Sequence, residues 1–303
     1  MIETGLSKKA YILLLIGVLA VSTAAILIRF ALPYAGSLAI SFYRMFFSSI
    51  IAVVVYRLSK EHKKLSELTA RQIILLILAG IFLALHFSLW TWSLELLSVS
   101  SSVFFVTTTP LWVGLFSPLI FKEKVGSQFY LGVLTAIFGG LIIAFLKDNL
   151  SIGIDANTSF FGLILALSGA WMASAYLIIG KKLSNSIPSK LYVTIVYAIS
   201  SLVLGIFMVV EQGKAYVVYH PIVYGLFLLM AVIPQSLGHT SFNTALKYLP
   251  AGIVSLALLC EPIGSTILAI LLLNEMPSIA ELIGGIFILV GLIIAIKPQP
   301  NVA

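Results

Sequence analysis

The sequence predicts an all-α integral membrane protein in which ten transmembrane helices form two inverted five-helix repeats. The first observation is composition: the 303 residues are 60% hydrophobic and 10% charged, with a mean hydropathy of +1.13. Soluble domains carry roughly 25% charged residues, so this chain cannot cover its surface with polar groups in water. The other two observations are an internal repeat and the placement of basic residues between long apolar runs.

The repeat links the stretch 85–142 to a stretch 152 positions later, without a gap. Its period is far too long for a solenoid and indicates a duplicated half-protein. We expect the first copy to cover 1–147 and the second to cover 158–303. The matched residues are Leu85, Leu97, Pro110, Glu123, Gly132, Gly139 and Ile142 with Leu237, Leu249, Pro262, Glu275, Gly284, Gly291 and Ile294.

Ten apolar segments satisfy the length of about 20 residues that a helix needs to cross a bilayer. Short connections separate them, and none leaves room for a soluble domain. The first segment is too long for the core of a signal peptide, so we expect it to be retained. The segments are 10–32, 36–57, 72–94, 99–121, 127–146, 159–181, 189–210, 221–245, 251–273 and 279–297.

The basic residues predict the orientation, because cytoplasmic loops carry an excess of Lys and Arg. Of 18 such residues, 14 fall on the side of the N-terminus and three, Arg29, Lys147 and Lys214, on the other, while Arg44 lies within a predicted helix. We therefore expect a multi-pass protein of the plasma membrane with both termini in the cytoplasm. Five helices per copy make the second copy enter from the opposite side, an inverted arrangement common in secondary transporters.

Other classes of protein find little support in the sequence. It contains no metalloprotease, nucleophile-elbow or phosphate-loop signature, so we expect no enzyme, no cofactor and no metal. The single Cys260 rules out an internal disulfide. The net charge of +7 comes from loops between apolar runs rather than from a basic domain, which argues against nucleic acid as a partner.

Several motifs resemble the EamA-type domain, the ten-helix branch of the drug/metabolite transporter superfamily. The resemblance spans Ala10 to Lys297 and rests on Arg44, Thr109-Pro110, Lys122-Glu123, Leu259-Cys260-Glu261-Pro262, Asn274-Glu275 and Ile283-Gly284-Gly285. It implies a carrier of small metabolites, often an exporter of amino acids, whose central cavity is lined mainly by helices other than the fifth and tenth. The coupling carboxylate of the small multidrug resistance branch has no counterpart, since 10–32 contains no Asp or Glu.

Two ionisable residues within predicted helices are candidates for function, because such residues are costly in a membrane. Arg44 must face the bundle interior or a cavity, where it binds either backbone carbonyls or a substrate. Glu261 precedes Pro262 at mid-depth, where it either satisfies freed backbone groups or couples transport to a proton or counter-substrate. Pairing of Arg44 with Glu261 is a further alternative.

Polar and aromatic residues at helical spacing complete the candidate binding site. His86 and Trp90 share a face of the third helix, and Gln235 and His239 share a face of the eighth. Helix–helix hydrogen bonding is the alternative role for each. The expected contacts are Arg44, His86, Trp90, Thr108, Trp112, Trp171, Gln235 and His239.

Four glycines have a different expected role. Gly132 and Gly139 in the fifth helix, and Gly284 and Gly291 in the tenth, are seven residues apart and lie on one face. Close backbone approach at small residues is how helices pack in lipid, so we expect these helices to hold the halves together.

Together these features predict a secondary transporter that works by alternating access between the lipid-embedded halves, with a small molecule as its partner. The leading hypothesis is efflux of amino acids or related compounds. Uptake or exchange of a nucleoside, sugar or drug is one alternative, and a structural or lipid-handling membrane protein without an aqueous pathway is another.

Overall fold

The computed structural model describes residues 2–59, 65–121, 127–146, 156–212, 218–249 and 251–296. Several residues used in the sequence argument lie outside these ranges, as do residues 147–155 of the predicted boundary between the copies at 147–158. They are Lys60, Lys63, Lys64, Lys122, Glu123, Lys124, Lys147, Lys214 and Lys297.

The described residues are helical in all ten predicted segments and contain no strand. In the first half the helices are α1 (Ile2–Val21), α2 (Ala24–Ala31), α3 (Ser37–Leu58), η1 (Leu65–Glu67), α4 (Ala70–Leu96), α5 (Val99–Val106), α6 (Thr109–Phe121) and α7 (Ser127–Leu146). In the second half they are α8 (Ala156–Leu183), α9 (Ser189–Gln212), α10 (Pro221–Met230), η2 (Ala231–His239), α11 (Thr240–Ala245), α12 (Ala251–Ala257), η3 (Leu258–Cys260), α13 (Glu261–Leu273) and α14 (Ile279–Ile296).

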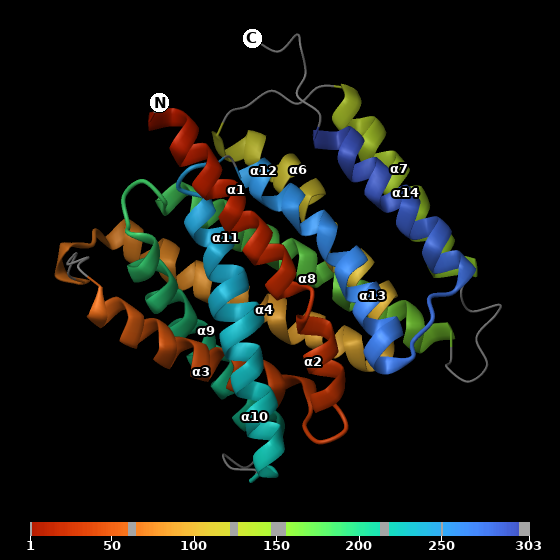
Figure 1. Cartoon of the computed structure of the whole chain (residues 1–303), viewed down its shortest axis with the longest axis horizontal. Helices are drawn as coiled ribbons and strands as arrows, with labels where there is room; N and C mark the ends of the chain where they lie inside the picture. Colours follow the sequence, from red (N-terminus) through yellow and green to blue (C-terminus); the bar gives the residue numbers. More distant parts are fainter. Residues whose placement is uncertain are drawn as a thin grey trace.

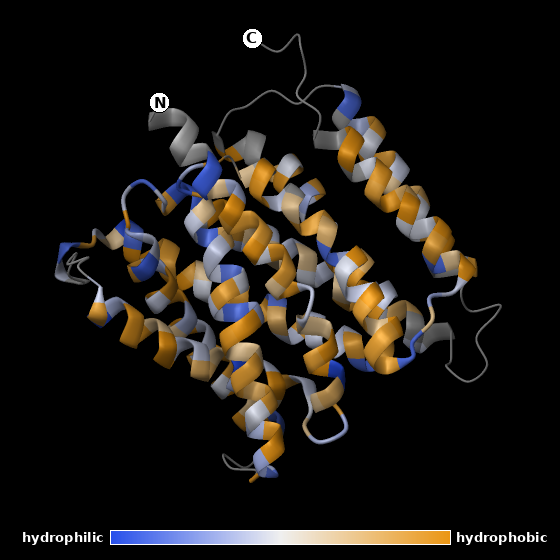
Figure 2. Ribbon diagram, viewed as in Figure 1, coloured by the Kyte–Doolittle hydropathy of each residue, from blue (hydrophilic) through white to orange (hydrophobic). Residues whose placement is uncertain are grey.

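Eight helical spans among the described residues are long and apolar enough to cross a membrane. Helices α7 and α14 contain shorter apolar segments, Tyr130–Ile143 and Ile279–Gly291. The part of the chain that the structure describes is thus all-α with eight candidate spans, and the full count of ten stays a prediction. Hydrophobic residues run along the helices and polar ones gather towards their ends and the loops, as a surrounding bilayer requires (Figure 2).

Four of the predicted segments are interrupted, which periodicity alone did not indicate. The segment 10–32 breaks between α1 and α2, and 99–121 breaks between α5 and α6. The segment 251–273 passes through the short 3₁₀ turn η3, and 221–245 contains the π-helical segment η2. Irregular backbone at membrane depth is tolerated only where protein or a cavity surrounds it, so these breaks point to the interior.

Helices α7 and α14 pack closely along one side of the molecule (Figure 1). Gly139 meets Gly284, since a Cβ built on Gly139 would lie 2.4 Å from the Gly284 carbonyl oxygen. Gly291 meets Gly132 in the same way, at 2.6 Å from its carbonyl oxygen. Gly139 thus contacts the repeat counterpart of Gly132, and Gly132 contacts the repeat counterpart of Gly139. The two helices therefore run antiparallel. Reciprocal contacts of this kind are those of a two-fold axis, as an inverted duplication requires.

Other contacts between the halves are also paired by the repeat, so that each contact has an equivalent in which the two copies exchange places. Helix α4 packs on α8, while the counterpart of α8, helix α1, packs on η2 and α11, the counterparts of α4. Helix α3 packs on its own counterpart α9. Among the residues that the structure describes, the main buried cluster runs from Ala10 to Ala269 through both halves, so the halves share one core. The interior between the two copies is therefore a continuous interface.

Candidate functional site

A small cavity lies between the two halves, lined by residues of both. Four of the residues predicted for binding or coupling reach it: His86 and Trp90 on α4, His239 in η2, and Glu261 on α13. The volume of the cavity is ≈ 40 Å³. One water needs about 10–15 Å³ by this measure, so the cavity holds a few water molecules. A metabolite therefore enters only if the cavity widens.

Two helix breaks at repeat-equivalent positions border the cavity. Helix α6 begins at Thr109 and α13 begins at Glu261, each one residue before a proline, Pro110 or Pro262. Proline lacks an N–H and clashes with the carbonyl four residues earlier, so a continuous helix is disfavoured at both places. Discontinuous helices of this kind form the substrate sites of many transporters.

The breaks bring residues to the cavity that the binding-site prediction missed. Thr107 and Thr109 come from the α5–α6 break, and Leu258 comes from the equivalent η3. The signal for them was present in the sequence, since Pro110 and Pro262 match across the repeat. Tyr176 and Phe242 also line the cavity, and no spacing rule singled them out.

His86 and Trp90 form a stacked pair on the cavity wall. Their ring centroids are 6.0 Å apart, with an interplanar angle of 12°. His86 Nδ1 lies 3.0 Å from the Gly169 carbonyl oxygen. A carbonyl only accepts, so Nδ1 carries the proton and Nε2 of the neutral ring remains an acceptor. Trp90 is 2% exposed, and its Nε1 finds no acceptor among the described residues.

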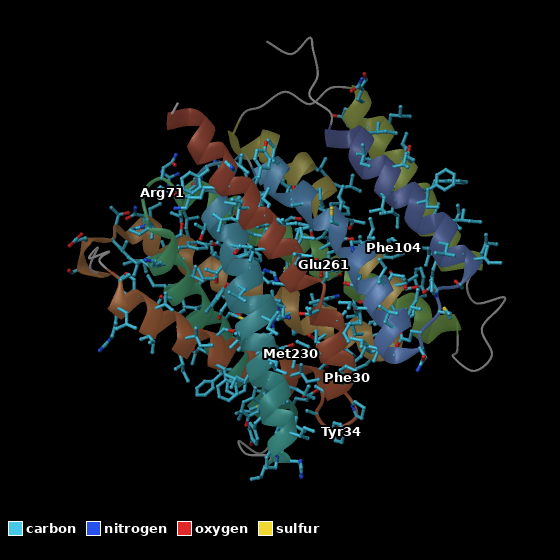
Figure 3. All side chains as sticks on the ribbon, viewed as in Figure 1. Phe30, Tyr34, Arg71, Phe104, Met230 and Glu261 are labelled. Atoms are coloured by element: carbon cyan, nitrogen blue, oxygen red, sulfur yellow. The ribbon has the colours of Figure 1, made fainter. Side chains whose placement is uncertain are left out.

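Glu261 is the carboxylate of the cavity. It is buried, near the centre of the molecule (Figure 3). Within the described part of the chain it makes no hydrogen bond and no ion pair. It stands at the start of α13, directly after the 3₁₀ turn η3 and before Pro262. The proposed pairing with Arg44 is not formed in this conformation, in which Arg29–Glu275 is the ion pair found among the described residues.

Arg44 and Gln235 lie off the cavity and bind each other. Arg44 is 1% exposed, and its Nε donates to Gln235 Oε1 at 3.0 Å. The Arg44 guanidinium lies 4.1 Å from the centroid of the Phe87 ring, which also contacts His239 at 5.2 Å. Arg44 Nη1 and Nη2 and Gln235 Nε2 are buried without an acceptor among the described residues. Buried donors left unpaired are costly, and an acceptor that reached this pair would lower that cost.

The π-helical segment η2 places Gln235 and His239 and contains Pro234. The backbone N–H of Thr240 donates to the Gln235 carbonyl five residues earlier, the bond that defines this geometry. Such segments are frequent at functional sites. One turn further on, Asn243 Nδ2 donates to the Tyr176 hydroxyl and to the His239 carbonyl oxygen. The polar stripe predicted on this helix is therefore used partly for internal hydrogen bonds.

Thr108, Trp112 and Trp171 form a separate group that does not line the cavity. Trp112 Nε1 donates to Thr108 Oγ1 at 3.2 Å, and the rings of Trp112 and Trp171 meet edge-on at 5.1 Å. Trp171 is 40% exposed on α8. The helix break at Thr107 turns Thr109, rather than Thr108, towards the cavity. No group of three or more metal-ligating side chains occurs among the described residues.

Comparison with known proteins places this architecture among transporters. The sequence model of the EamA-like transporter family matches residues 8–145 and 160–297. An uncharacterized transporter from Clostridium kluyveri is 26% identical over 240 residues, which cover 77% of this chain and 74% of the relative. A crystal structure with 14% sequence identity superimposes with a TM-score of 0.67, covering 95% of this chain and 96% of the other, and so shares its fold.

Proposed function

Since this chain belongs to the EamA-like transporter family of multi-pass membrane proteins, we propose that it exports amino acids or related compounds by alternating access. Its family and its relative indicate a transporter of small molecules rather than an enzyme. The proposal adds the substrate class, the direction and the mechanism. It includes ten membrane crossings in two inverted copies, with both termini in the cytoplasm.

The observation that carries the proposal is a cavity between the copies whose lining includes a carboxylate, Glu261, and an indole, Trp90, whose buried N–H has no acceptor among the described residues. Glu261 comes from the second copy and Trp90 from the first, and neither side chain has a polar partner among the described residues. A buried carboxylate and a buried N–H without partners are both costly, and a ligand with an ammonium group and a carboxylate would satisfy both. An amino acid carries these two groups on one carbon atom.

In the proposed complex Glu261 binds the ammonium group of the substrate. The Trp90 indole N–H binds its carboxylate. The rings of His86, Trp90 and His239 surround the side chain. Phe87 lies between the Arg44 guanidinium and His239 and contacts both. When the cavity widens by movement of Phe87, the substrate can contact Arg44 and Gln235.

Coupling follows from the same residues. Glu261 either takes up a proton once the substrate leaves or binds a counter-substrate, and either event neutralises its charge during the return of the empty carrier. A buried charge is costly in a membrane, so the return step is faster with Glu261 neutralised.

The test is transport by the purified protein in proteoliposomes. A panel of radiolabelled amino acids, nucleosides, sugars and cationic drugs would be offered under inward and outward gradients, with and without a pH gradient. We expect at least one amino acid to move and its neighbours in the panel to compete. Movement of only nucleosides, sugars or drugs would contradict the substrate class, and movement of nothing in the panel would contradict the transport proposal as stated.

A further inference from the structure

At the end of the molecule that carries Arg29, a network of polar contacts joins the two copies. Here α2 ends beside the loop after α13. Arg29 Nε and Nη2 donate to Glu275 Oε1 at 2.9 and 2.6 Å. Glu275 belongs to the second copy and Arg29 to the first. The pair therefore bridges the interface that has to separate if the cavity is to open at this end.

Both partners are fixed by further bonds. Arg29 Nη1 donates to the Leu94 carbonyl oxygen at 2.9 Å, at the end of α4. Glu275 Oε2 accepts from the Val99 backbone N–H at 3.0 Å, at the start of α5. Glu275 follows Asn274, which adopts a left-handed conformation with φ 55° and ends α13. Carboxylate and guanidinium are thus oriented before they meet, which reduces the entropy lost in pairing them.

Weaker polar contacts continue the same interface towards the cavity. Ser265 Oγ on α13 donates to the Ser22 carbonyl oxygen at 3.2 Å, and Ser100 Oγ lies 3.3 Å from Thr266 Oγ1. Helix α13 begins with Glu261, which lines the cavity, and ends next to Glu275. Moving α13 away from α2 and α5 would connect the cavity to this end.

The opposite end offers an internal comparison. Lys181 is the repeat counterpart of Arg29, and it donates to the carbonyl oxygens of Leu246 and Leu249 at 3.0 and 3.1 Å. Leu246 is itself the counterpart of Leu94. The bond within one copy is therefore present twice, while Glu123, the repeat counterpart of Glu275, lies outside the described residues.

We infer that Arg29 and Glu275 form an access latch, an ion pair between the copies that must break for the cavity to open at the Arg29 end. The latch rests on the proposed alternating access. It assigns a role to two residues outside the cavity that the binding-site prediction did not include.

The test measures access to the cavity rather than transport. Cys260 is replaced by Ala, and Ala173→Cys supplies a thiol on the cavity wall. A membrane-impermeant maleimide is added separately from each side of sealed vesicles, with no substrate present. Glu275→Gln should label about fivefold faster than the parent from the side of the Arg29 end, as loss of a well-oriented, partly exposed ion pair allows.

Two variants make the result specific. Glu95→Gln removes another carboxylate at the same end, whose Oε1 accepts from the Ser37 backbone N–H at 2.8 Å within the first copy, and it should label at the parent rate. Arg29→Lys keeps the positive charge, and Lys181 shows that the equivalent position accepts a lysine. The cavity thiol should be labelled more slowly in Arg29→Lys than in Glu275→Gln.

Labelling of Glu275→Gln at the parent rate, or equal acceleration in Glu95→Gln, would overturn the latch. Since no substrate takes part, failure of the transport panel leaves this test intact. Acceleration seen only from the cytoplasmic side would support the latch and contradict the proposed orientation instead.

Discussion

Trp90 shows how one side chain can be unfavourable for stability and useful for binding. Its ring packs on His86, but its N–H is buried with no acceptor in the described part of the protein. A donor in this state costs about 1–3 kcal/mol. A substrate that supplies the acceptor recovers this free energy on binding. The same reasoning applies to the Arg44–Gln235 pair, whose unpaired nitrogens lie next to Phe87.

Trp90→Phe should separate these two effects. The substitution keeps a ring and removes the N–H, so the substrate KM for transport should rise about threefold to tenfold, the value of one hydrogen bond. The apparent melting temperature without substrate should stay the same or rise. Trp92→Phe is the control, because Trp92 is 42% exposed and packs on Phe161 away from the cavity. A KM effect of equal size in both variants would contradict the assignment.

Glu261→Gln tests whether Glu261 binds the positively charged ammonium group of the substrate. The amide retains the shape of the side chain but cannot neutralise an ammonium group, so transport of a zwitterion at low substrate concentration should fall by about tenfold or more. The affinity for substrate analogues that lack the amino group should fall much less. The measurement is competition by such analogues in proteoliposomes, and an equal loss for both kinds of ligand would argue against an ammonium site.

At the scale of elements, the helices divide into rigid pairs and interrupted ones. Helices α7 and α14 approach through backbone at Gly139 and Gly284, with the side chains of Ile143 and Phe287 packed beside the contact. The interrupted helices α5–α6 and α12–α13 surround the cavity. In the proposed mechanism, the close packing of the halves and the binding of substrate therefore depend on different helices.

Gly284→Ala should destabilise the pairing of α7 with α14. A Cβ there would lie 2.5 Å from the Gly139 carbonyl oxygen and 2.6 Å from Ile143, so the helices must move apart at a cost of about 1–3 kcal/mol. Thermal unfolding in detergent should show a lower midpoint. Gly225→Ala is the matched control, since nothing lies within 4 Å of its Cβ, and it should be neutral or stabilising. Equal midpoints for the two variants would contradict this packing.

The sequence predicted the fold class better than it predicted the site, and the reason is the range of the interactions involved. Hydropathy and the repeat depend on many residues, so the family membership and the all-helical fold were accessible, and both are confirmed. The helix breaks depend on local geometry around Pro110 and Pro262, and they decide that Thr109 rather than Thr108 reaches the cavity. The positions of Trp112 and Trp171 depend on which face of each helix meets its neighbour, which helical spacing cannot specify.

At the scale of the whole molecule, the orientation can be tested independently of transport. We expect both ends of the chain in the cytoplasm, because 14 of the 18 Lys and Arg fall on that side of the predicted topology. Green fluorescent protein fused to the C-terminus should fluoresce, and alkaline phosphatase fused there should be inactive. The reverse pattern would contradict the predicted topology.

The two interrupted helices also bear on the relative free energies of the access states. Each end of the molecule contains one fragment from each copy: α5 contacts α13 at the Arg29 end, and α6 contacts α12 at the other. If the copies were identical, exchanging their conformations would turn one state into the other, rotated about a two-fold axis in the membrane plane, and the two states would have equal free energy. The resting equilibrium is therefore set by the positions at which the copies differ, such as Arg29 and Lys181. Evolution of a carrier with this architecture can tune which side it faces at rest by single substitutions far from the substrate.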